Sequence, residues 1–407
     1  MPREFDCVVV GAGLAGAALA IGLARFGLKV AAVDARKPVA LVQGGDVRGL
    51  ALAVSSQRLL NALDLWPKLA PRLTPIRRIE VSARGHFGGS TLCAEDVGLP
   101  ALGHICPADH LQSTLDTALL DTPGLTPFFG AALAQLTVEE ASVQLRLADS
   151  EPDAALRCRL VIAADGSQSA VRRHYGIEAT HHDYQQTAIV ANVDIARAQP
   201  DTACERLTAH GPCALLPLGG TRQVLVRTVP REQADRWLAA SADNFLADVQ
   251  QDFGWRLGRF SGLGERRAHP LVLNRANALT APRAVLVGNA ANTIHPNAAQ
   301  GLNLALRDVA VLLESLKDCS RTGGDPGEAT RLAAYAERRR ADHARTVQFS
   351  DGLARLFALD WPLLGVARGA ALVACDALPG LRRAVMRRLM GLGAPPPDWL
   401  RAAYAHD

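Results

Sequence analysis

The chain has few aromatic residues and no clustered cysteines, and these absences exclude several classes of function. Phe, Trp and Tyr make up 5% of the 407 residues, and the Arg residues are scattered along the chain. Neither the stacking surface nor the basic stripe of a nucleic-acid-binding protein is therefore expected. The eight Cys are dispersed, with no C-x-x-C pair and no Cys/His group at zinc spacing, so no metal site is predicted. Such thiols are typical of small buried side chains in a reducing compartment, and the cytoplasm is the expected location.

A strong charge imbalance and a clear membrane-spanning segment are also missing. The net charge is +4, which is mildly basic. Residues 7–24 carry no charge, but glycines at turn spacing open this stretch, and Glu4 and Asp6 offset the basic residues that a signal peptide needs. A length of 407 residues is enough for a large core and for two or three domains.

The segment FDCVVVGAGLAGAALAIGLARFGLKVAAVD, residues 5–34, is the most informative part of the sequence. An apolar run at residues 7–10 predicts a buried strand, and a helical pattern follows a glycine-rich turn and ends near Gly27. Residues 30–33 predict a second strand, which ends at an acidic residue. This order of strand, glycine turn, helix, strand and acid indicates a dinucleotide-binding βαβ unit.

Each position of this motif has a physical role. Gly11 allows the tight turn, Gly13 lets the backbone approach a pyrophosphate, and Gly16 lets helix and strand pack closely. The start of the helix offers N–H groups and a partial positive charge to the diphosphate. Asp34 lies where a carboxylate accepts the ribose hydroxyls.

Two later apolar runs, residues 160–164 and 284–287, indicate that the chain returns to the same parallel layer. Alternating patterns near residue 80 and from residue 187 to 229 are typical of antiparallel strands. We therefore predict an α/β fold, in which a Rossmann-type parallel sheet carries an inserted antiparallel sheet and C-terminal helices. The expected boundaries are residues 1–75, 105–175 and 270–320 for the nucleotide-binding domain, 76–104 and 176–269 for the inserted sheet domain, and 328–407 for the helices.

Three segments together resemble the flavoprotein aromatic hydroxylases of the para-hydroxybenzoate hydroxylase class. They are the N-terminal glycine turn, VIAADGSQS at residues 161–169, and AVLVGNAANTIHPNAAQGLNLALRD at residues 284–308. Residues 82–88, 205–212 and 253–258 are similar to those of the UbiH-type 2-polyprenyl-6-methoxyphenol hydroxylases of ubiquinone biosynthesis. The resemblance covers nearly the whole chain.

The resemblance implies FAD as the cofactor, with NADPH or NADH as a transient co-substrate and O2 as the oxidant. The implied reaction is hydroxylation of a polyprenylated phenol through a flavin C4a-hydroperoxide. The residues implied to contact FAD come from all three segments and the loop after Asp34, and they are Gly11, Gly13, Gly16, Asp34, Arg48, Asp165, Gly166, Gly288, Asn289, Pro296, Gly301, Leu302 and Asn303. Arg48 could equally be a solvated surface charge, and Asp165 could cap the next helix.

The sequence departs from the family pattern at two positions. Asn289 stands where the family usually has an Asp that binds a ribityl hydroxyl, as it does in the UbiH-type branch. Ala299 stands where the family usually has Gly, and its Cβ narrows the backbone conformations that are open to the flavin loop. These departures affect the detailed contacts of the flavin ring and not the fold.

Three residues are candidates for catalysis by resemblance: His295 in the flavin loop, and His86 and Arg84 from the sheet expected to cover the substrate. A single His in a sequence is more often structural than catalytic, so both readings are kept for each histidine.

Two other functions are compatible with these motifs. A sister ubiquinone-pathway hydroxylase acting at another ring carbon, or a flavin-binding subunit of the biosynthetic complex with little turnover, fits the same motifs. A flavin disulfide reductase is disfavoured because no paired redox Cys follows the glycine turn. A flavin halogenase is disfavoured because its Trp-x-x-Ile-Pro segment is missing.

The expected partners include other ubiquinone-biosynthesis proteins and the inner-membrane surface. Residues 381–390 have an apolar stripe with arginines beside it, which indicates either a packing helix or an interfacial helix held against anionic lipid. The stripe comprises Leu381, Val385, Met386, Leu389 and Met390, and the arginines are Arg382, Arg383, Arg387 and Arg388.

Overall fold

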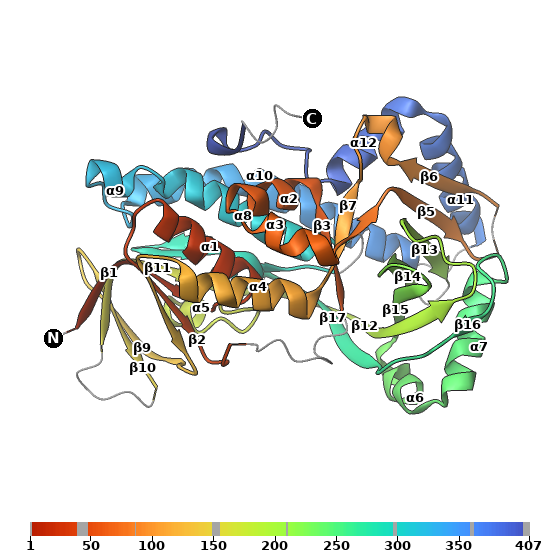
Figure 1. The fold of residues 1–407 in the computed structure, drawn as a ribbon, viewed down its shortest axis with the longest axis horizontal. Coiled ribbons are helices and arrows are strands. Elements are labelled where there is room, and N and C mark those ends of the chain that lie inside the picture. The colour runs from red at the N-terminus through yellow and green to blue at the C-terminus, as the bar shows by residue number, and fades with distance from the viewer. Residues whose placement is uncertain are drawn as a thin grey trace.

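Two large sheets organise the molecule, one toward each end of its long axis (Figure 1). The structure is a computed structural model that describes residues 2–38, 48–85, 87–148, 155–208, 211–295, 299–358 and 362–401. For residues 353–358 and 362–368 it describes the backbone alone.

The first sheet contains a parallel layer of five strands in the order β19-β11-β1-β2-β8. These are β1 (Arg3–Val10), β2 (Val30–Asp34), β8 (Leu125–Phe129), β11 (Leu156–Ala163) and β19 (Ala284–Leu286). Val8 on β1 is level with Ala31 on β2 and with Val161 on β11. The predicted parallel layer and its two later returns are confirmed. The hairpin of β9 (Leu133–Val138) and β10 (Val143–Leu147) and the short β18 (Thr280–Ala281) complete this sheet.

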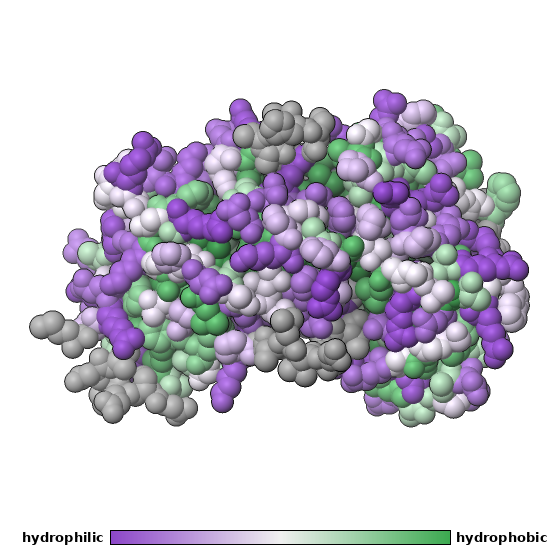
Figure 2. All heavy atoms as spheres, viewed as in Figure 1, coloured by the Kyte–Doolittle hydropathy of each residue, from purple (hydrophilic) through white to green (hydrophobic). Residues whose placement is uncertain are grey.

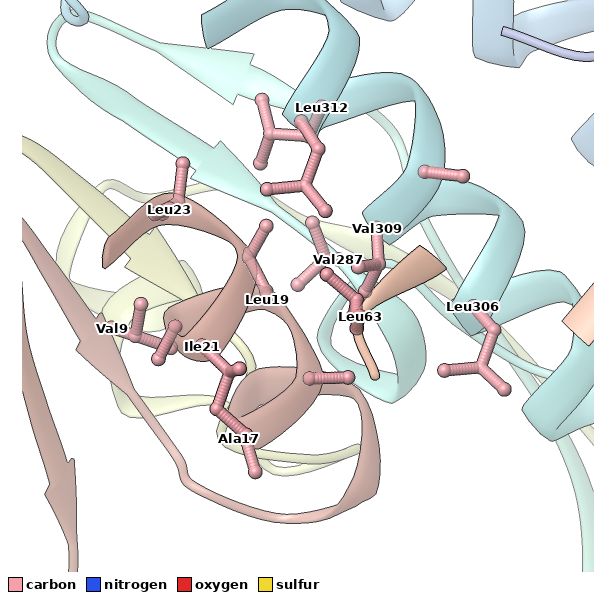
Figure 3. Packing of buried hydrophobic residues seen from close by; sticks show 14 of the residues in the cluster. Val9, Ala17, Leu19, Ile21, Leu23, Leu63, Val287, Leu306, Val309 and Leu312 are labelled. Carbon is pink, nitrogen blue, oxygen red and sulfur yellow. The ribbon is translucent and has the colours of Figure 1, made fainter. Parts of the chain in front are cut away.

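Helices bury one face of this sheet in the largest apolar core. The main ones are α1 (Leu14–Arg25), α4 (Ala108–Asp121) and α8 (Gln300–Leu316). Figure 3 shows Leu19 of α1 and Val309 of α8 meeting beside Val287. A Cβ on Gly22 would lie 2.6 Å from Leu313, so α1 and α8 approach closely because α1 is built from small residues. Each fully buried Leu in such a core contributes about 1.5–3 kcal/mol.

The second sheet has nine strands and is largely antiparallel. Its strands are β5 (Arg78–Ala83), β6 (Gly89–Cys93), β12 (Ala179–Ile195), β13 (Thr202–Thr208), β14 (Gly211–Pro217), β15 (Arg222–Pro230), β16 (Phe260–Ser261), β17 (Arg267–Ala276) and β20 (Asn292–Thr293). The predicted domain boundary at residue 269 falls inside β17. Because β17 pairs with β12 as far as Ala276, the inserted sheet extends past that boundary.

The two faces of the nine-stranded sheet have different neighbours. One face packs on α6 (Ala234–Ala239) and α7 (Ala242–Phe253), where Phe245 meets Leu215 and Leu225. Ser241 accepts a hydrogen bond from the N–H of Asn244 and so begins α7 as a helix separate from α6.

The opposite face meets a small sheet made of β3 (Gly49–Ala53), β4 (Thr74–Ile76) and β7 (Gly103–Pro107). A Cβ on Gly49 would lie 2.8 Å from Val224 of β15 and 2.9 Å from Ile105, which places these backbones in close contact. This face of the nine-stranded sheet therefore turns toward the parallel domain.

The C-terminal region is helical, as predicted, in α10 (Ala329–Ala358), α11 (Pro362–Ala377) and α12 (Pro379–Leu389). Met386 and Met390 of the α12 region are each 1% exposed and pack with Val54 and Leu92. Most of the apolar stripe of α12 therefore faces the protein, which is the packing alternative. Shorter helices are α2 (Val54–Ala62), α3 (Trp66–Leu69), α5 (Ala170–His174) and α9 (Cys319–Thr322).

On the face shown in Figure 2, polar and apolar residues are interspersed, and no extended apolar patch is visible there. Within the described parts of the chain, none of the helices combines the length and the apolar character that crossing a bilayer requires.

Candidate functional site

The three glycines of the N-terminal turn occupy very different surroundings. Gly11 has φ +95°, and a Cβ there would overlap the backbone of Ala164. A Cβ on Gly16 would overlap the carbonyl oxygen of Gly11. Gly13, in contrast, has no atom within 4 Å of its Cβ position, so the space beside it is open. Two glycines thus serve the fold, and the third leaves room for a ligand at the start of α1.

The predicted ribose carboxylate lies beside this turn. Asp34 accepts hydrogen bonds from the N–H of Ala12 at 2.7 Å and from the N–H of Arg36 at 2.8 Å. It ends β2 and is only partly buried, so a carboxylate with spare acceptor capacity lies next to the open space at Gly13.

Arg36 is a site residue that the sequence interpretation missed. Its guanidinium binds both oxygens of Asp116 at 2.7 and 2.8 Å and donates to the carbonyl oxygen of Ala12 at 2.6 Å. Burial alone would lower the pKa of Arg36, but the carboxylates of Asp116 and Asp34 raise it. A permanent cation therefore stiffens the glycine turn. In the sequence, the only indication of this role was the position of Arg36, two residues after Asp34.

Asp165 lies two residues after the end of β11, and its two carboxylate oxygens have different surroundings. Its Oδ2 accepts from the N–H groups of Ala170 at 2.7 Å and Val171 at 3.2 Å, so it caps α5 as the alternative reading proposed. Its Oδ1 is buried and has no hydrogen-bond partner among the residues that the structure describes. Gly166 has φ +81° and open space at its Cβ position. This turn therefore presents an unused acceptor beside room for a ligand.

The third motif forms the start of α8. Gly288 is buried with φ +60°, whereas Asn289 is exposed. Ala299 precedes the helix in the left-handed conformation, with φ +50°. The N–H groups of the first turn, which includes Gly301 and Leu302, have no intrahelical partners. Pro296 lies outside the described residues.

The side chain of Asn303 makes hydrogen bonds within the protein. Its Oδ1 accepts from the N–H of Ala53 at 2.8 Å and from Oγ of Ser56 at 2.7 Å. Its Nδ2 donates to the carbonyl oxygens of Ala51 and Ala299, each at 2.9 Å. This amide fixes the start of α8 against β3 and α2. Arg48, which is exposed, directly precedes β3, and its carbonyl oxygen accepts from Ala108.

A buried ionic network supports the same loop from behind. Asp308, 1% exposed, accepts from the N–H of Gly288 at 3.1 Å, from Nε of Arg339 at 2.7 Å and from Nε2 of His343 at 2.6 Å. Nδ1 of His343 lies 2.7 Å from the amide of Asn292. Burial alone would raise the pKa of Asp308, but His343 and Arg339 hold it below its usual value. The network ties α8 and α10 to the end of β19.

Of the three candidate catalytic residues, the two that the structure describes, His295 and Arg84, lie in different surroundings. His295 is 1% exposed, packs edge-on against the ring of Tyr184 at 4.9 Å, and its carbonyl oxygen accepts from Ser350. Arg84 pairs at 2.6 Å with Asp252 of α7, on the face of the sheet away from the parallel domain. His86 lies outside the described residues. The positions of His295 and Arg84 favour roles in packing and in holding α7, respectively.

Glu205 is a second residue that the interpretation missed. Its neighbours along the same face of β13 are Ala203, which packs with Ile105, and Leu207, which packs with Leu372. Because side chains alternate along a strand, Glu205 points to this face, which is the one turned toward the parallel domain. Burial raises the pKa of Glu205 from 4.5 to about 6. Glu205 belongs to the segment 205–212 that resembles the UbiH-type hydroxylases, but the resemblance implies no role for it.

The observations fit FAD on physical grounds. The open space at Gly13 suits a diphosphate, Asp34 offers an acceptor for ribose hydroxyls, and the free Oδ1 of Asp165 offers an acceptor where β11 ends. The α8 N-terminus supplies a partial positive charge. All of these groups follow the carboxyl ends of parallel strands or begin helices, where ligands bind in open α/β sheets.

Comparison with known proteins agrees with this geometry. The family model described as the FAD binding domain matches residues 4–350. The ubiquinone hydroxylase UbiL of Rhodospirillum rubrum is 36% identical over 97% of this chain and 92% of its own length. The 3-demethoxyubiquinol 3-hydroxylase of Escherichia coli is 30% identical over 95% of this chain and 98% of its own length.

The fold also matches that of a solved monooxygenase. The p-nitrophenol 4-monooxygenase PnpA of Pseudomonas putida superposes with a TM-score of 0.79 over 97% of this chain and 99% of that one, at 16% identity. FAD as the cofactor and the hydroxylase fold are thus confirmed. The chain belongs to the FAD binding domain family and, within it, to the FAD-dependent aromatic hydroxylases that include the ubiquinone hydroxylases.

Proposed function

We propose that the protein hydroxylates the ring of a polyprenylated methoxyphenol in ubiquinone biosynthesis. The observation that carries the proposal is that two relatives named as ubiquinone-type hydroxylases align at 30–36% identity over nearly the whole of both chains. The balanced reaction consumes one O2, one NAD(P)H and one proton for each ring hydroxylated, and it releases one water. One oxygen atom enters the ring, and the other leaves in the water.

The residues that would hold FAD are those of the three turns. Gly13 and the α1 N-terminus would receive the diphosphate, Asp34 the ribose, and Asp165 with the α8 N-terminus the flavin half. When bound, FAD supplies the redox chemistry, by accepting a hydride from NAD(P)H and activating O2. The protein's own part is to stabilise negative charge at the α8 N-terminus and to keep water from the ring between the two sheets.

The test is a single-turnover experiment. The FAD-loaded protein is reduced with NADPH or NADH without oxygen, then mixed with ¹⁸O2 and a candidate phenol, and the products are analysed by mass. One ¹⁸O atom in the product for each NAD(P)H consumed is expected. Hydrogen peroxide as the sole oxygen product with every polyprenyl phenol offered would contradict the proposal.

A sister reaction at another ring carbon is the second candidate, because one of the relatives is named a 3-demethoxyubiquinol 3-hydroxylase. The position of the new hydroxyl in the product separates the two. A weakly catalytic flavin-binding subunit is the third, and stoichiometric product in the same experiment excludes it.

The proposal includes contact with the cytoplasmic surface of the inner membrane and with other proteins of the pathway. Four exposed apolar side chains lie at the β5–β6 turn and the α11–α12 junction: Phe87 (92% exposed), Val373 (41%), Leu378 (55%) and Leu381 (45%). The backbone of Phe87 packs on Gly369 of α11, and Gly88 packs near Val373, which joins the two segments. We name these four residues the apolar tip. Exposed Arg383 and Arg387 lie on the adjoining α12 and suit anionic lipid.

A further inference from the structure

A cavity of about 220 Å³ lies between α8, α10 and the end of α12, and none of the residues expected to hold FAD lines it. Its polar lining comes mainly from Gln300, Arg307, Asp342, Arg345 and Arg388, with the ring of Phe349 as an apolar wall. The volume corresponds to roughly seven water molecules in the liquid. It has room for a phosphate or a pyrophosphate but not for a whole dinucleotide.

The charge of this lining is positive. Three arginines face one carboxylate, and that carboxylate is already committed. Asp342 accepts from Nε of Arg307 at 2.8 Å and from Nη1 of Arg339 at 2.7 Å. Arg339 in turn neutralises the buried Asp308. Arg345 and Arg388 therefore contribute positive charge that no carboxylate among the described residues offsets.

The guanidinium of Arg307 gives an independent indication of a ligand. Its side chain is 13% exposed, and Nε and Nη2 are bound by Asp342 and Thr346. Its Nη1 is buried and has no hydrogen-bond partner within the described parts of the chain. A buried donor on a charged group is costly to leave unpaired. Arg388 is held 5.2 Å from the centre of the Phe349 ring, which positions a second guanidinium at the same cavity.

We infer that this cavity binds the phosphoryl group of a small anionic ligand. Guanidinium groups match phosphate oxygens with paired N–H donors, and several of them around one partly enclosed cavity favour a group with two negative charges over chloride. The inference rests on the cavity and not on the hydroxylation proposed above, so either can fail without the other.

The cavity is joined to the flavin loop. Nε2 of Gln300, the first residue of α8, donates to the carbonyl oxygen of Leu389 at 3.2 Å, and the N–H of Ser55 donates to that of Met390 at 3.1 Å. An anion that bridges Arg307 of α8 and Arg388 of α12 would stabilise this contact. Binding should therefore raise the melting temperature of the FAD-loaded protein and change its flavin fluorescence.

The test uses inorganic pyrophosphate with the FAD-loaded protein, followed by calorimetry and by thermal unfolding. Saturable binding by the native protein is expected, with potassium chloride at equal ionic strength giving no shift. Arg345→Ala alone should weaken binding, and Arg345→Ala combined with Arg388→Ala should raise the Kd at least tenfold. Because Arg345 is exposed, the single variant keeps the test valid if the double variant loses FAD or unfolds.

Matched controls come from the same two helices. Arg340 of α10 is 69% exposed and pairs with Glu337, and Arg383 of α12 is exposed; neither lines the cavity. Arg340→Ala and Arg383→Ala should change the Kd by less than twofold. No saturable binding to the native protein, or equal weakening by the control pair, overturns the inference.

Competition identifies the source of the phosphoryl group. Displacement of pyrophosphate by NADPH but not by NADH assigns the cavity to a nucleotide 2′-phosphate, and displacement by both assigns it to the nucleotide diphosphate. Displacement by neither assigns it to free phosphate or pyrophosphate. Each of these results supports the anion site, since each requires saturable pyrophosphate binding.

Discussion

At the scale of single residues, Gly13 and Gly16 should separate cofactor binding from folding. Gly13→Val is expected to abolish FAD retention, because the branched side chain fills the space for the diphosphate, while the apoprotein stays folded since no protein atom lies within 4 Å. Gly16→Val should instead destabilise the fold by about 3 kcal/mol or more, because its Cβ overlaps the carbonyl oxygen of Gly11. Flavin absorbance and urea unfolding measure the two effects. Stoichiometric FAD in purified Gly13→Val would show that the diphosphate binds elsewhere.

Replacement of Ala299 by glycine should not reduce stability or activity. Its φ of +50° is unfavourable for a residue with a Cβ by about 1–2 kcal/mol. Ala299→Gly should therefore keep FAD bound, leave hydroxylation undiminished and leave the melting temperature unchanged or higher, because the removed strain offsets the greater freedom of the unfolded chain. Ala310→Gly, in the middle of the same helix, is the contrasting control and should cost about 1 kcal/mol. A large fall in coupled product in Ala299→Gly would indicate a positive role for this methyl group.

Glu205 should make stability depend on pH. Its pKa is raised from 4.5 to about 6 by burial, so the folded protein holds this proton more tightly than the unfolded chain does. The stabilisation is complete below pH 4.5 and is lost as the pH rises to about 6, by at most about 2 kcal/mol. Glu205→Gln should remove this part of the slope when urea unfolding is measured from pH 4.5 to 7. Glu95→Gln, at an exposed carboxyl of the short turn η2 (Ala94–Val97), is the control. Equal slopes in the native protein and Glu205→Gln would contradict the assignment.

At the scale of elements, the ionic network between α8, α10 and β19 should carry much of the stability of the flavin loop. Asp308→Asn leaves the buried guanidinium of Arg339 with Asp342 as its remaining carboxylate partner, so it is expected to destabilise the protein by about 3 kcal/mol, the lower end of the cost of breaking a buried ion pair. Because the pKa of Asp308 is lowered in the fold, its contribution is present near neutral pH and is lost as the pH falls. Asp318→Asn removes an exposed pair with Arg321 and should leave the unfolding midpoint nearly unchanged. Similar midpoints for both variants would refute the role of the network.

The helices and strands also show which features of the fold can be predicted from sequence patterns. The glycine turn and the parallel strands could be predicted because apolar runs and turn residues define them locally, as β1 and the turn at Gly11 illustrate. The side of the sheet on which Arg84 acts was not, because its partner Asp252 lies 168 residues away. Likewise, the end of the inserted sheet depends on the pairing of β12 with β17. The alternation of side chains along a strand indicates which residues face the core, but it does not indicate which strand is the partner.

The unpaired oxygen of Asp165 and the partly enclosed cavity beside Arg307 could not be predicted from the sequence either. Both result from how segments far apart in the chain meet, as when α8, α10 and α12 enclose the cavity. The residues expected at the flavin were identified from motifs, and their roles stay predictions. Gly13 and Gly166 lie where a ligand has room, whereas Gly11, Gly16 and the side chain of Asn303 are used within the protein.

At the scale of the whole molecule, the apolar tip should set contact with the membrane. Phe87→Ser combined with Leu378→Ser removes two exposed apolar side chains and should weaken binding to vesicles with anionic lipid roughly tenfold, equivalent to about 1.4 kcal/mol of lost burial. Turnover of a long-tailed substrate in vesicles should fall, and that of a short-tailed analogue should not. Leu120→Ser, at a 60% exposed side chain of α4, is the matched control. Equal sedimentation of all three proteins with vesicles would exclude the tip as the contact.

The strand order has a consequence for the synthesis of the protein on the ribosome. β1 is made first, but its partner β11 follows about 150 residues later and β19 about 120 residues after that. At about 5–20 residues per second, β1 waits roughly 10–30 s for β11. The α1 and α8 N-termini, which we expect to form the two halves of the flavin site, cannot face each other until α8 has emerged at Leu316. A nascent chain that ends before α8 should carry the parallel sheet without one of its covering helices, so its apolar face stays exposed and becomes a target for chaperones.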